Sequence, residues 1–235
     1  MSVTEALLDR GSPRPLITYY DDATGERVEL SGVTTANWAA KTANLLRDEC
    51  DLAPGGRVAV LLPAHWQTAA GLLGAWWCGA EVVGDPEGAD VVLCDAGRLD
   101  LALSVAPPHA VVALSLDAFG KALTGLPDGV LDYATEVRLH GDEFTPWEPV
   151  PGTAPALDGD PVDAVVADAR ARAAALGLTA GDRVLSTREW SDPAGLRDGL
   201  LAVLAAGASL VQCRNAGSTD LEARGRSEKT THRLD

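Results

Sequence analysis

Apolar residues along this chain fall into short continuous runs, which alternate with longer stretches in which apolar residues recur at helical spacing. Short runs bounded by glycine, proline or charged residues are typical of strands buried on both faces. They predict strands at residues 57–62, 81–84, 90–94, 110–114, 183–187 and 208–213. The spaced stretches predict helices at residues 34–46, 65–78, 99–105, 162–176 and 193–205. This alternation favours the α/β class, with mainly parallel sheets and helical crossovers.

Two segments depart from this alternation. Residues 16–20 and 27–30 flank a turn-forming run, which predicts an antiparallel β-ribbon near the start of the chain. Residues 145–161 are rich in proline and glycine, so we interpret them as a connector. The predicted organisation is a first α/β subdomain at residues 1–144, the connector, a second α/β subdomain at residues 162–217, and a polar tail at residues 218–235. In that tail we expect a turn or two of helix before a frayed end.

The composition narrows the classes of partner and compartment. The 235 residues carry a net charge of −15, which repels nucleic-acid phosphates and anionic membranes, so we expect neither as a partner. The most apolar stretch, residues 69–84, is interrupted by Glu81 and is too short to cross a bilayer. The N-terminus has no apolar signal segment, and the four cysteines form no close pair. We therefore expect a cytoplasmic protein.

The chain contains an internal repeat. The sequence LAPGGRV at residues 52–58 recurs as LTAGDRV at residues 178–184, and GAEVV at residues 79–83 is echoed by GASLV at residues 207–211. Each copy predicts a glycine turn, a buried strand, a crossover helix and a second buried strand, which gives two similar βαβ units. A simpler explanation stays open, because any α/β protein reuses glycine at such turns and valine in such strands.

Several connected motifs resemble the N-terminal domain of the adenylate-forming superfamily, which includes acyl-CoA synthetases, nonribosomal-peptide adenylation domains and luciferase. The similar segments are residues 34–46, 54–63, 70–83 and 176–185. Residues 131–140, LDYATEVRLH, and the short length are similar to a small actinobacterial-type family of truncated relatives. The resemblance implies a truncated, acetyl-CoA synthetase-like N-terminal fold with two βαβ subdomains, the second repeating residues 51–83. A fold does not by itself imply a chemistry.

The groups that adenylation requires are absent from the matching positions. The resemblance implies a Ser/Thr/Gly-rich loop with a lysine, which holds the ATP phosphates, but the corresponding residues 156–163 read ALDGDPVD. Val162 stands at the lysine position, and Asp158, Asp160 and Asp163 add negative charge. Such a composition disfavours an anion site, so we interpret the segment as an acidic loop.

The family's later motifs for adenine, ribose and the catalytic lysine also have no counterpart in this sequence. We therefore assign no catalytic, cofactor-binding or metal-binding residue and expect no cofactor. An enzymatic activity is left open but is not favoured.

One cluster is a candidate ligand crevice: Arg188, Glu189, Trp190 and Asp192. These residues should project from the carboxyl end of a parallel strand, where open α/β sheets bind ligands. The alternative interpretation is a solvated loop in which Asp192 caps a helix that starts at Pro193.

Other chemistries find little support in the sequence. The four histidines, at positions 65, 109, 140 and 232, have no partner at metal-binding spacing, and we expect His65 to cap a helix start. No nucleophile elbow, P-loop or dinucleotide-binding fingerprint occurs. Cys78 is expected to be a buried structural thiol rather than a reactive one.

Three functional hypotheses follow. The first is a non-catalytic relative of adenylate-forming enzymes with a binding, scaffolding or regulatory role, either self-associating or held by an unknown protein partner. The second is a half-enzyme that retains nucleotide or acyl-CoA binding near residues 188–195 and is completed by a partner chain. The third is a small-molecule sensor with an enclosed apolar pocket.

Overall fold

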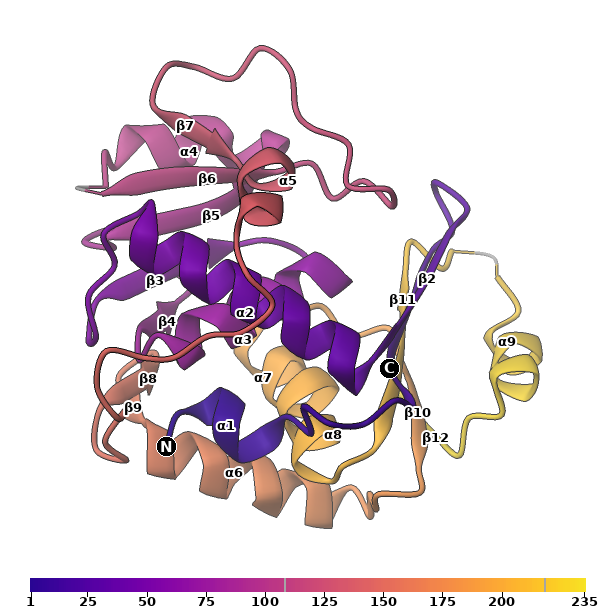
Figure 1. The fold of residues 1–235 in the computed structure, drawn as a ribbon. Helices are drawn as coiled ribbons and strands as arrows, with labels where there is room; N and C mark the ends of the chain where they lie inside the picture. Colours follow the sequence, from indigo (N-terminus) through magenta and orange to yellow (C-terminus); the bar gives the residue numbers. More distant parts are fainter. Residues whose placement is uncertain (108, 218) are drawn as a thin grey trace. The chain divides into compact units, whose positions relative to one another are not determined.

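The computed structural model describes residues 1–107, 109–217 and 219–235 and consists of two compact units. Unit 1 comprises Met1–Ala6, Ala36–Leu62 and Gln67–Val165, and unit 2 comprises Leu7–Thr35, Pro63–Trp66 and Val166–Asp235. Both units are α/β, as the alternating pattern predicts (Figure 1). The predicted subdomain bounds at residues 144, 161 and 217 stay predictions, and residues 108 and 218 lie outside the described residues.

Unit 1 is built on a seven-stranded sheet with the order β7-β6-β5-β3-β4-β8-β9. All neighbouring strands are parallel except the pair β8 and β9. Its strands are β3 (Arg57–Leu61), β4 (Glu81–Val83), β5 (Val91–Asp95), β6 (Ala110–Leu114), β7 (Val130–Asp132), β8 (Pro155–Leu157) and β9 (Asp160–Pro161). Apolar residues on its central strands, among them Val92, Cys94 and Val111, form a continuous core cluster.

The helical segments that lie wholly or mostly in unit 1 are α1 (Val3–Leu7), α2 (Gly32–Asp48), α3 (Trp66–Trp77), α4 (Leu99–Ser104), α5 (Tyr133–Glu136) and two 3₁₀ turns, η1 (Ala96–Arg98) and η2 (Val137–Leu139). Two small residues let α3 pack closely. A Cβ at Gly71 would lie 3.1 Å from Leu93 of β5, and one at Gly74 would lie 2.8 Å from Thr42 of α2. No helix in the described part of the chain combines the length and apolar character needed to cross a membrane.

Unit 2 is built on a five-stranded sheet with the order β12-β10-β11-β1-β2, parallel except for β1 and β2. Its strands are β1 (Pro15–Asp21), β2 (Glu26–Ser31), β10 (Arg183–Ser186), β11 (Ser209–Arg214) and β12 (His232–Leu234). The helical segments are α6 (Val162–Ala175), α7 (Pro193–Leu196), a π-helical segment η3 (Arg197–Leu201), α8 (Ala202–Ala205) and α9 (Leu221–Glu228). The predicted N-terminal ribbon is the pair β1 and β2, and β1 joins the parallel strands through β11.

The end of the chain differs from the sequence expectation. Residues 221–228 form the expected short helix, α9, but the end does not fray, because His232–Leu234 pairs in parallel with β10 as strand β12. A three-residue strand with two polar side chains has no apolar run, so no pattern announces it.

The internal repeat is structural as well as sequential. Both helices that precede the second strand end in a glycine with positive φ, 80° at Gly79 and 67° at Gly207. Gly79 N–H donates to Trp76 O and Ala80 N–H to Ala75 O, and the same offsets recur from Gly207 to Leu204 and from residue 208 to residue 203. These are the paired bonds of a Schellman helix end, which requires a residue in the left-handed conformation.

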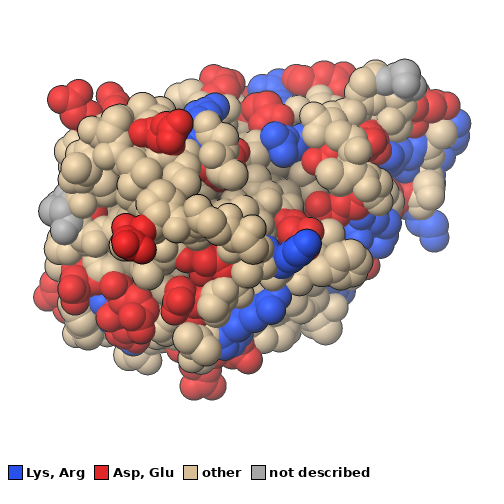
Figure 2. All heavy atoms as spheres, turned by 90° about the horizontal axis from the view of Figure 1, so that it is seen from above, with Lys and Arg blue, Asp and Glu red and all other residues tan. Residues whose placement is uncertain are grey.

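Figure 2 shows acidic side chains scattered over one face of the molecule, together with some basic ones, among residues of other types.

Candidate functional site

The segment that the sequence resemblance aligns with a phosphate-binding loop is a tight β-hairpin in unit 1. Strands β8 and β9 meet at a turn formed by Asp158 and Gly159, whose φ angles are 48° and 88°. Asp158 N–H donates to Val82 O at 3.0 Å, and Gly159 N–H donates to the Glu81 carboxylate at 2.7 Å. Both turn N–H groups are therefore committed to protein acceptors, and one of those acceptors is itself an anion.

The hairpin continues in the same way beyond the turn. Val162 N–H donates to Ala154 O at 3.0 Å, and Asp163 N–H donates to Gly152 O at 2.9 Å. The Asp163 carboxylate lies so close to Gly152 that a Cβ there would be 2.3 Å from its Oδ2. Val162, which the resemblance aligns with a lysine, is buried and belongs to the core. These contacts fit the acidic-loop interpretation and leave these N–H groups no role as donors to a phosphate.

The predicted crevice lies at the carboxyl end of β10 in unit 2. Asp192 has extended backbone angles and accepts the Gly195 N–H at 3.0 Å, and Pro193 is the first residue of α7. The prediction that Asp192 caps this helix is therefore confirmed. Glu189 accepts the N–H of Ala64 through its Oε2 at 3.3 Å. Two of the four predicted residues are thus engaged in fixing the loop.

Three polar contacts hold Arg188 at the carboxyl edge of the sheet in unit 2. Its Nη1 lies 3.1 Å from the Asp198 carboxylate, its backbone N–H donates to Ser186 Oγ, and its carbonyl accepts from Gln212 Nε2. Asp198 also binds Arg172 at 2.7 Å, so one carboxylate holds two guanidinium groups. The Arg188 Nε is buried and has no hydrogen-bond partner among the described residues.

The Trp190 side chain packs against the helix that follows the loop. That helix widens into the π-helical segment η3, which contains Gly199, and a Cβ at Gly199 would lie 3.3 Å from Trp190 Nε1 and 3.4 Å from Ser186 Oγ. Trp190 Nε1 and Gln212 Oε1 are both buried and lack a hydrogen-bond partner in the described part of the chain. Buried polar atoms of this kind are rare and need an explanation, and π-helical turns are frequent at functional sites.

Residues that sequence reasoning did not connect also reach this edge. The register pairs Tyr19 with Gln212 and Gln212 with Ser186, so these side chains lie in one row across three strands. The Tyr19 ring packs edge-on against His65 at 4.4 Å, and His65 Nε2 lies 3.7 Å from Glu26 Oε1. Burial lowers the pKa of His65, although Glu26 opposes that shift. These residues are far apart in the sequence and become neighbours only when the strands pair, so no local sequence pattern links them.

The described residues form neither a metal-binding cluster nor a reactive thiol site. The described residues contain no group of three or more His, Cys, Asp or Glu side chains placed to hold a metal ion. All four cysteines are free and buried, and burial raises the pKa of Cys78 to about 12. A thiol with so high a pKa is a poor nucleophile at neutral pH, as expected for a structural cysteine.

Comparison with solved structures defines the class of fold. The chain superposes on a Brucella canis acyl-CoA synthetase with a TM-score of 0.82 at 20% identity, covering 99% of this chain and 47% of that one. It superposes on a benzoate CoA ligase from Burkholderia xenovorans LB400 with a TM-score of 0.75 at 17% identity, covering 99% and 50%. It also matches the anthranilate CoA ligase AuaEII, solved in complex with anthranoyl-AMP, with a TM-score of 0.72 at 17% identity, covering 90% and 44%.

The fold thus matches that of the N-terminal part of acyl-CoA synthetases, as the motifs predict. The chain spans about half the length of these solved structures, and at such identities the likeness concerns the fold alone. No family model matches the sequence. A "TIGR03089 family protein" of Mycobacterium tuberculosis (strain ATCC 25618 / H37Rv) is 56% identical over 241 residues, which cover 99% of this chain and 98% of the relative. The chain belongs to the TIGR03089 family, whose name states no activity.

Proposed function

We propose that this protein is a non-catalytic relative of the adenylate-forming ligases, with a binding, scaffolding or regulatory role. The observation that carries the proposal is the hairpin β8–β9. Its N–H groups at residues 158, 159, 162 and 163 are all donated within the protein. Phosphate sites in proteins depend on free N–H groups and cationic side chains, whereas these four N–H groups are occupied and residues 155–163 contain no Lys or Arg.

Charge supports the same conclusion. Asp158, Asp160 and Asp163 lie on or beside the turn, and the Glu81 carboxylate already binds the Gly159 N–H. Arg57, the cation that contacts Glu81, is itself paired with this carboxylate at 3.3 Å. A nucleotide triphosphate placed there would meet carboxylates without a compensating cation, which is unfavourable at short range.

Calorimetric titration with ATP–Mg²⁺ and an ATP–pyrophosphate exchange assay test this proposal. We expect no exchange with any carboxylic acid and no binding below the millimolar range. A Glu81→Gln variant serves as the matched control, because it keeps the hydrogen bond to Gly159 but removes one negative charge. Micromolar binding of ATP–Mg²⁺ together with exchange would contradict the proposal.

A second candidate function rests on a different observation, the buried polar atoms without partners at the carboxyl edge of the unit 2 sheet. Trp190 Nε1, Arg188 Nε and Gln212 Oε1 offer two donors and one acceptor to a ligand. They favour a half-enzyme that retains acyl or acyl-adenylate binding and obtains its missing groups from a partner chain. The AuaEII structure contains an acyl-adenylate, anthranoyl-AMP, which makes that compound a suitable probe.

Trp190→Phe and Trp147→Phe separate the two candidates. Trp190 is buried at this edge, whereas Trp147 is 64% exposed in unit 1. If the half-enzyme is correct, anthranoyl-AMP binds and only Trp190→Phe weakens the binding. If the non-catalytic role is correct, neither the wild type nor the variants bind it measurably.

The compartment and the assembly state belong to the same proposal. Free, buried cysteines support a reducing cytoplasm. We also propose self-association or an unknown protein partner as the means by which a non-catalytic member acts. Sedimentation measurements over a range of concentrations test the self-association, and a monomer at every concentration would contradict it.

A further inference from the structure

A hollow of about 450 Å³ lies at the amino ends of the parallel strands in unit 2, at the edge of the sheet opposite the predicted crevice. It is formed by the segment before β1, the loops that lead into β10 and β11, and the residue after α9. Leu16, which is half-buried, and the exposed Ala180 contribute apolar surface, whereas Leu204 and Ala208 line the hollow but are almost fully buried. A volume of this size is within the range of small-molecule sites.

Three cations and two carboxylates line this hollow: Arg14, Arg183, Lys229, Asp9 and Asp182. Asp182 is fully engaged by the protein. One of its oxygens accepts from the Thr179 N–H and hydroxyl, both at 2.7 Å, and the other accepts from Thr231 Oγ1 at 2.8 Å. Asp9 accepts the Gly11 N–H at 3.2 Å. Both carboxylates therefore stabilise turns of the protein itself.

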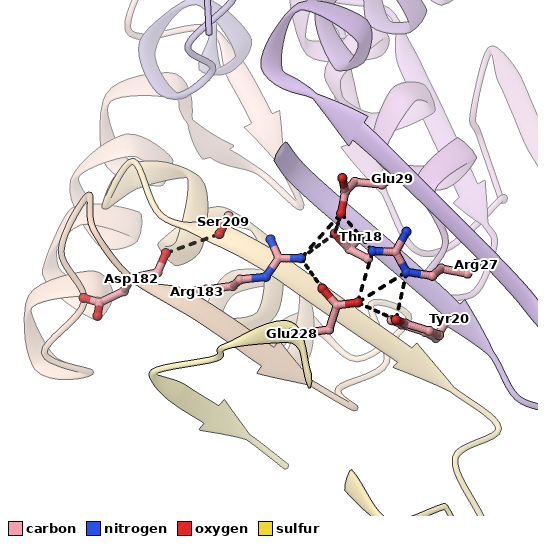
Figure 3. A network of polar contacts seen from close by, with 8 residues as sticks. All are labelled: Thr18, Tyr20, Arg27, Glu29, Asp182, Arg183, Ser209 and Glu228. Carbon is pink, nitrogen blue, oxygen red and sulfur yellow. Dashed lines mark hydrogen bonds and ion pairs between the residues drawn. The ribbon is translucent and has the colours of Figure 1, made fainter. Parts of the chain in front are cut away.

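Arg183 is also engaged. Its Nη2 lies 2.6 Å from the Glu228 carboxylate and 2.9 Å from Thr18 Oγ1, and Figure 3 shows that Glu228 in turn faces Arg27 and Tyr20. The remaining two cations differ. Among the residues that the structure describes, neither Arg14 nor Lys229 has a side-chain hydrogen bond or an ion pair. In a chain with a net charge of −15, two unpaired cations on one hollow form a local site for an anion.

The backbone at both cations is restricted. Arg14 stands between Pro13 and Pro15, which limit its backbone to extended conformations. Lys229 adopts the left-handed conformation at the end of α9, with φ 55°, where helices usually place glycine because other residues are strained there. The presence of a lysine at such a strained position indicates a role for its side chain. A restricted backbone also loses less conformational entropy when a ligand is bound.

We propose that this hollow binds a small organic anion with an apolar portion, of the class of medium-chain carboxylates. Arg14 and Lys229 bind the anionic group, and Leu16 and Ala180 pack against the apolar portion. The site is separate from the nucleotide and acyl positions considered above and does not depend on the proposed function.

Titration of the full chain with octanoate, followed by ¹⁵N-resolved NMR, tests the proposal. We expect saturable shifts of the amides of residues 16, 181, 207 and 209, and at least a tenfold weaker affinity in the variant Arg14→Gln/Lys229→Gln. Arg226→Gln is the matched control, because this exposed arginine lies on α9 but does not line the hollow. Equal affinity in the double variant and the wild type, or shifts elsewhere, would overturn the proposal.

Two further arms separate the anionic from the apolar contribution. Ala180 lines the hollow and is exposed, so Ala180→Leu should fill it and abolish octanoate binding without unfolding the chain. Inorganic phosphate, which carries charge but no apolar part, should bind at least tenfold more weakly than octanoate. Phosphate binding as tight as that of octanoate, or full binding by Ala180→Leu, would contradict the proposed ligand class.

Discussion

The two edges of the five-stranded sheet in unit 2 differ in what they bury and what they leave open. At the carboxyl edge, the loop after β10 is closed by short contacts, and a Cβ at Gly195 would lie 2.0 Å from the Glu189 carbonyl oxygen. At the amino edge, the strands begin beside a hollow of about 450 Å³ lined by two unpaired cations. Open α/β sheets usually bind ligands at the carboxyl edge. In unit 2 of this chain, the hollow described above lies at the amino edge instead.

This difference shows why fold likeness alone does not place a binding site. The sheet, the crossover helix and the glycine turn of the repeat define the fold, whereas the side chains decide which edge is accessible. Four substitutions test how tightly the carboxyl edge is packed and which contacts stabilise the other parts of unit 2. They run from the largest expected change in the free energy of unfolding to the smallest.

Gly195→Ala should cause the largest loss. The clash is with a backbone atom, which cannot rotate away, so we expect the free energy of unfolding in urea to fall by about 3 kcal/mol. Gly181→Ala is the matched control at the amino edge. A Cβ there meets nothing within 4 Å, and its stability should change by less than about 0.5 kcal/mol. A stable Gly195→Ala variant would show that the carboxyl edge is not closed.

The network around Glu228 should make the free energy of unfolding depend on pH. Burial acts in the opposite direction, but hydrogen bonds from Tyr20, Arg183 and Arg27 lower the pKa of Glu228 to about 2. Because this pKa lies below the unfolded value of about 4.3, the contribution to stability is fully present above that value. It is lost as the pH falls from about 5 through about 2.

The variant Glu228→Gln measures this contribution. At pH 7 we expect it to reduce the free energy of unfolding by about 2 kcal/mol, and the difference from the wild type should shrink as the pH falls towards 2. Glu222→Gln, whose side chain is 74% exposed, should follow the wild type at every pH. A difference for Glu228→Gln that is the same at pH 7 and pH 3 would argue against the assigned pKa.

Asp192→Ala tests the helix cap at the carboxyl edge. Loss of the acceptor for the Gly195 N–H should lower the free energy of unfolding by about 1 kcal/mol. Ser191→Ala changes the preceding exposed residue and should have no measurable effect. Equal stabilities of the two variants would mean that Asp192 does not hold the loop.

Lys229→Gly should have the smallest effect, and with the opposite sign. Glycine adopts the left-handed conformation without strain, so we expect a gain of about 0.5 kcal/mol in thermal or urea unfolding. Lys229→Ala keeps the strain and should show no gain. Loss of stability in Lys229→Gly would indicate that the lysine side chain supports the fold, which would weaken its assignment to ligand binding.

Much of the fold could be predicted from the sequence because the central strands are buried on both faces. Runs such as Val91–Leu93 and Ala110–Leu114 have no polar interruption, and the glycines at 79 and 207 mark the helix ends. Strand β12 and the hairpin β8–β9 escaped prediction, since they are short, polar or rich in proline. Short strands of this kind obtain their order from a neighbouring strand rather than from their own pattern.

The candidate sites were predictable only in part. Asp192 before Pro193 is a local signal, and the capping prediction is confirmed. The hollow depends on residues near 14, 183, 207 and 229, which are far apart in the sequence, and no periodicity connects them. The row formed by Tyr19, Gln212 and Ser186 likewise exists only after the strands have paired.

The hydrogen bond between the Gly159 amide and Glu81 has a consequence for any attempt to build a phosphate site into this hairpin. Replacing Val162 by lysine alone would place a cation beside a turn whose two amides are already bonded within the protein, and the Glu81 carboxylate would compete with an incoming phosphate for the Gly159 amide. We therefore expect that several simultaneous changes are needed and that a single substitution at residue 162 creates no such site.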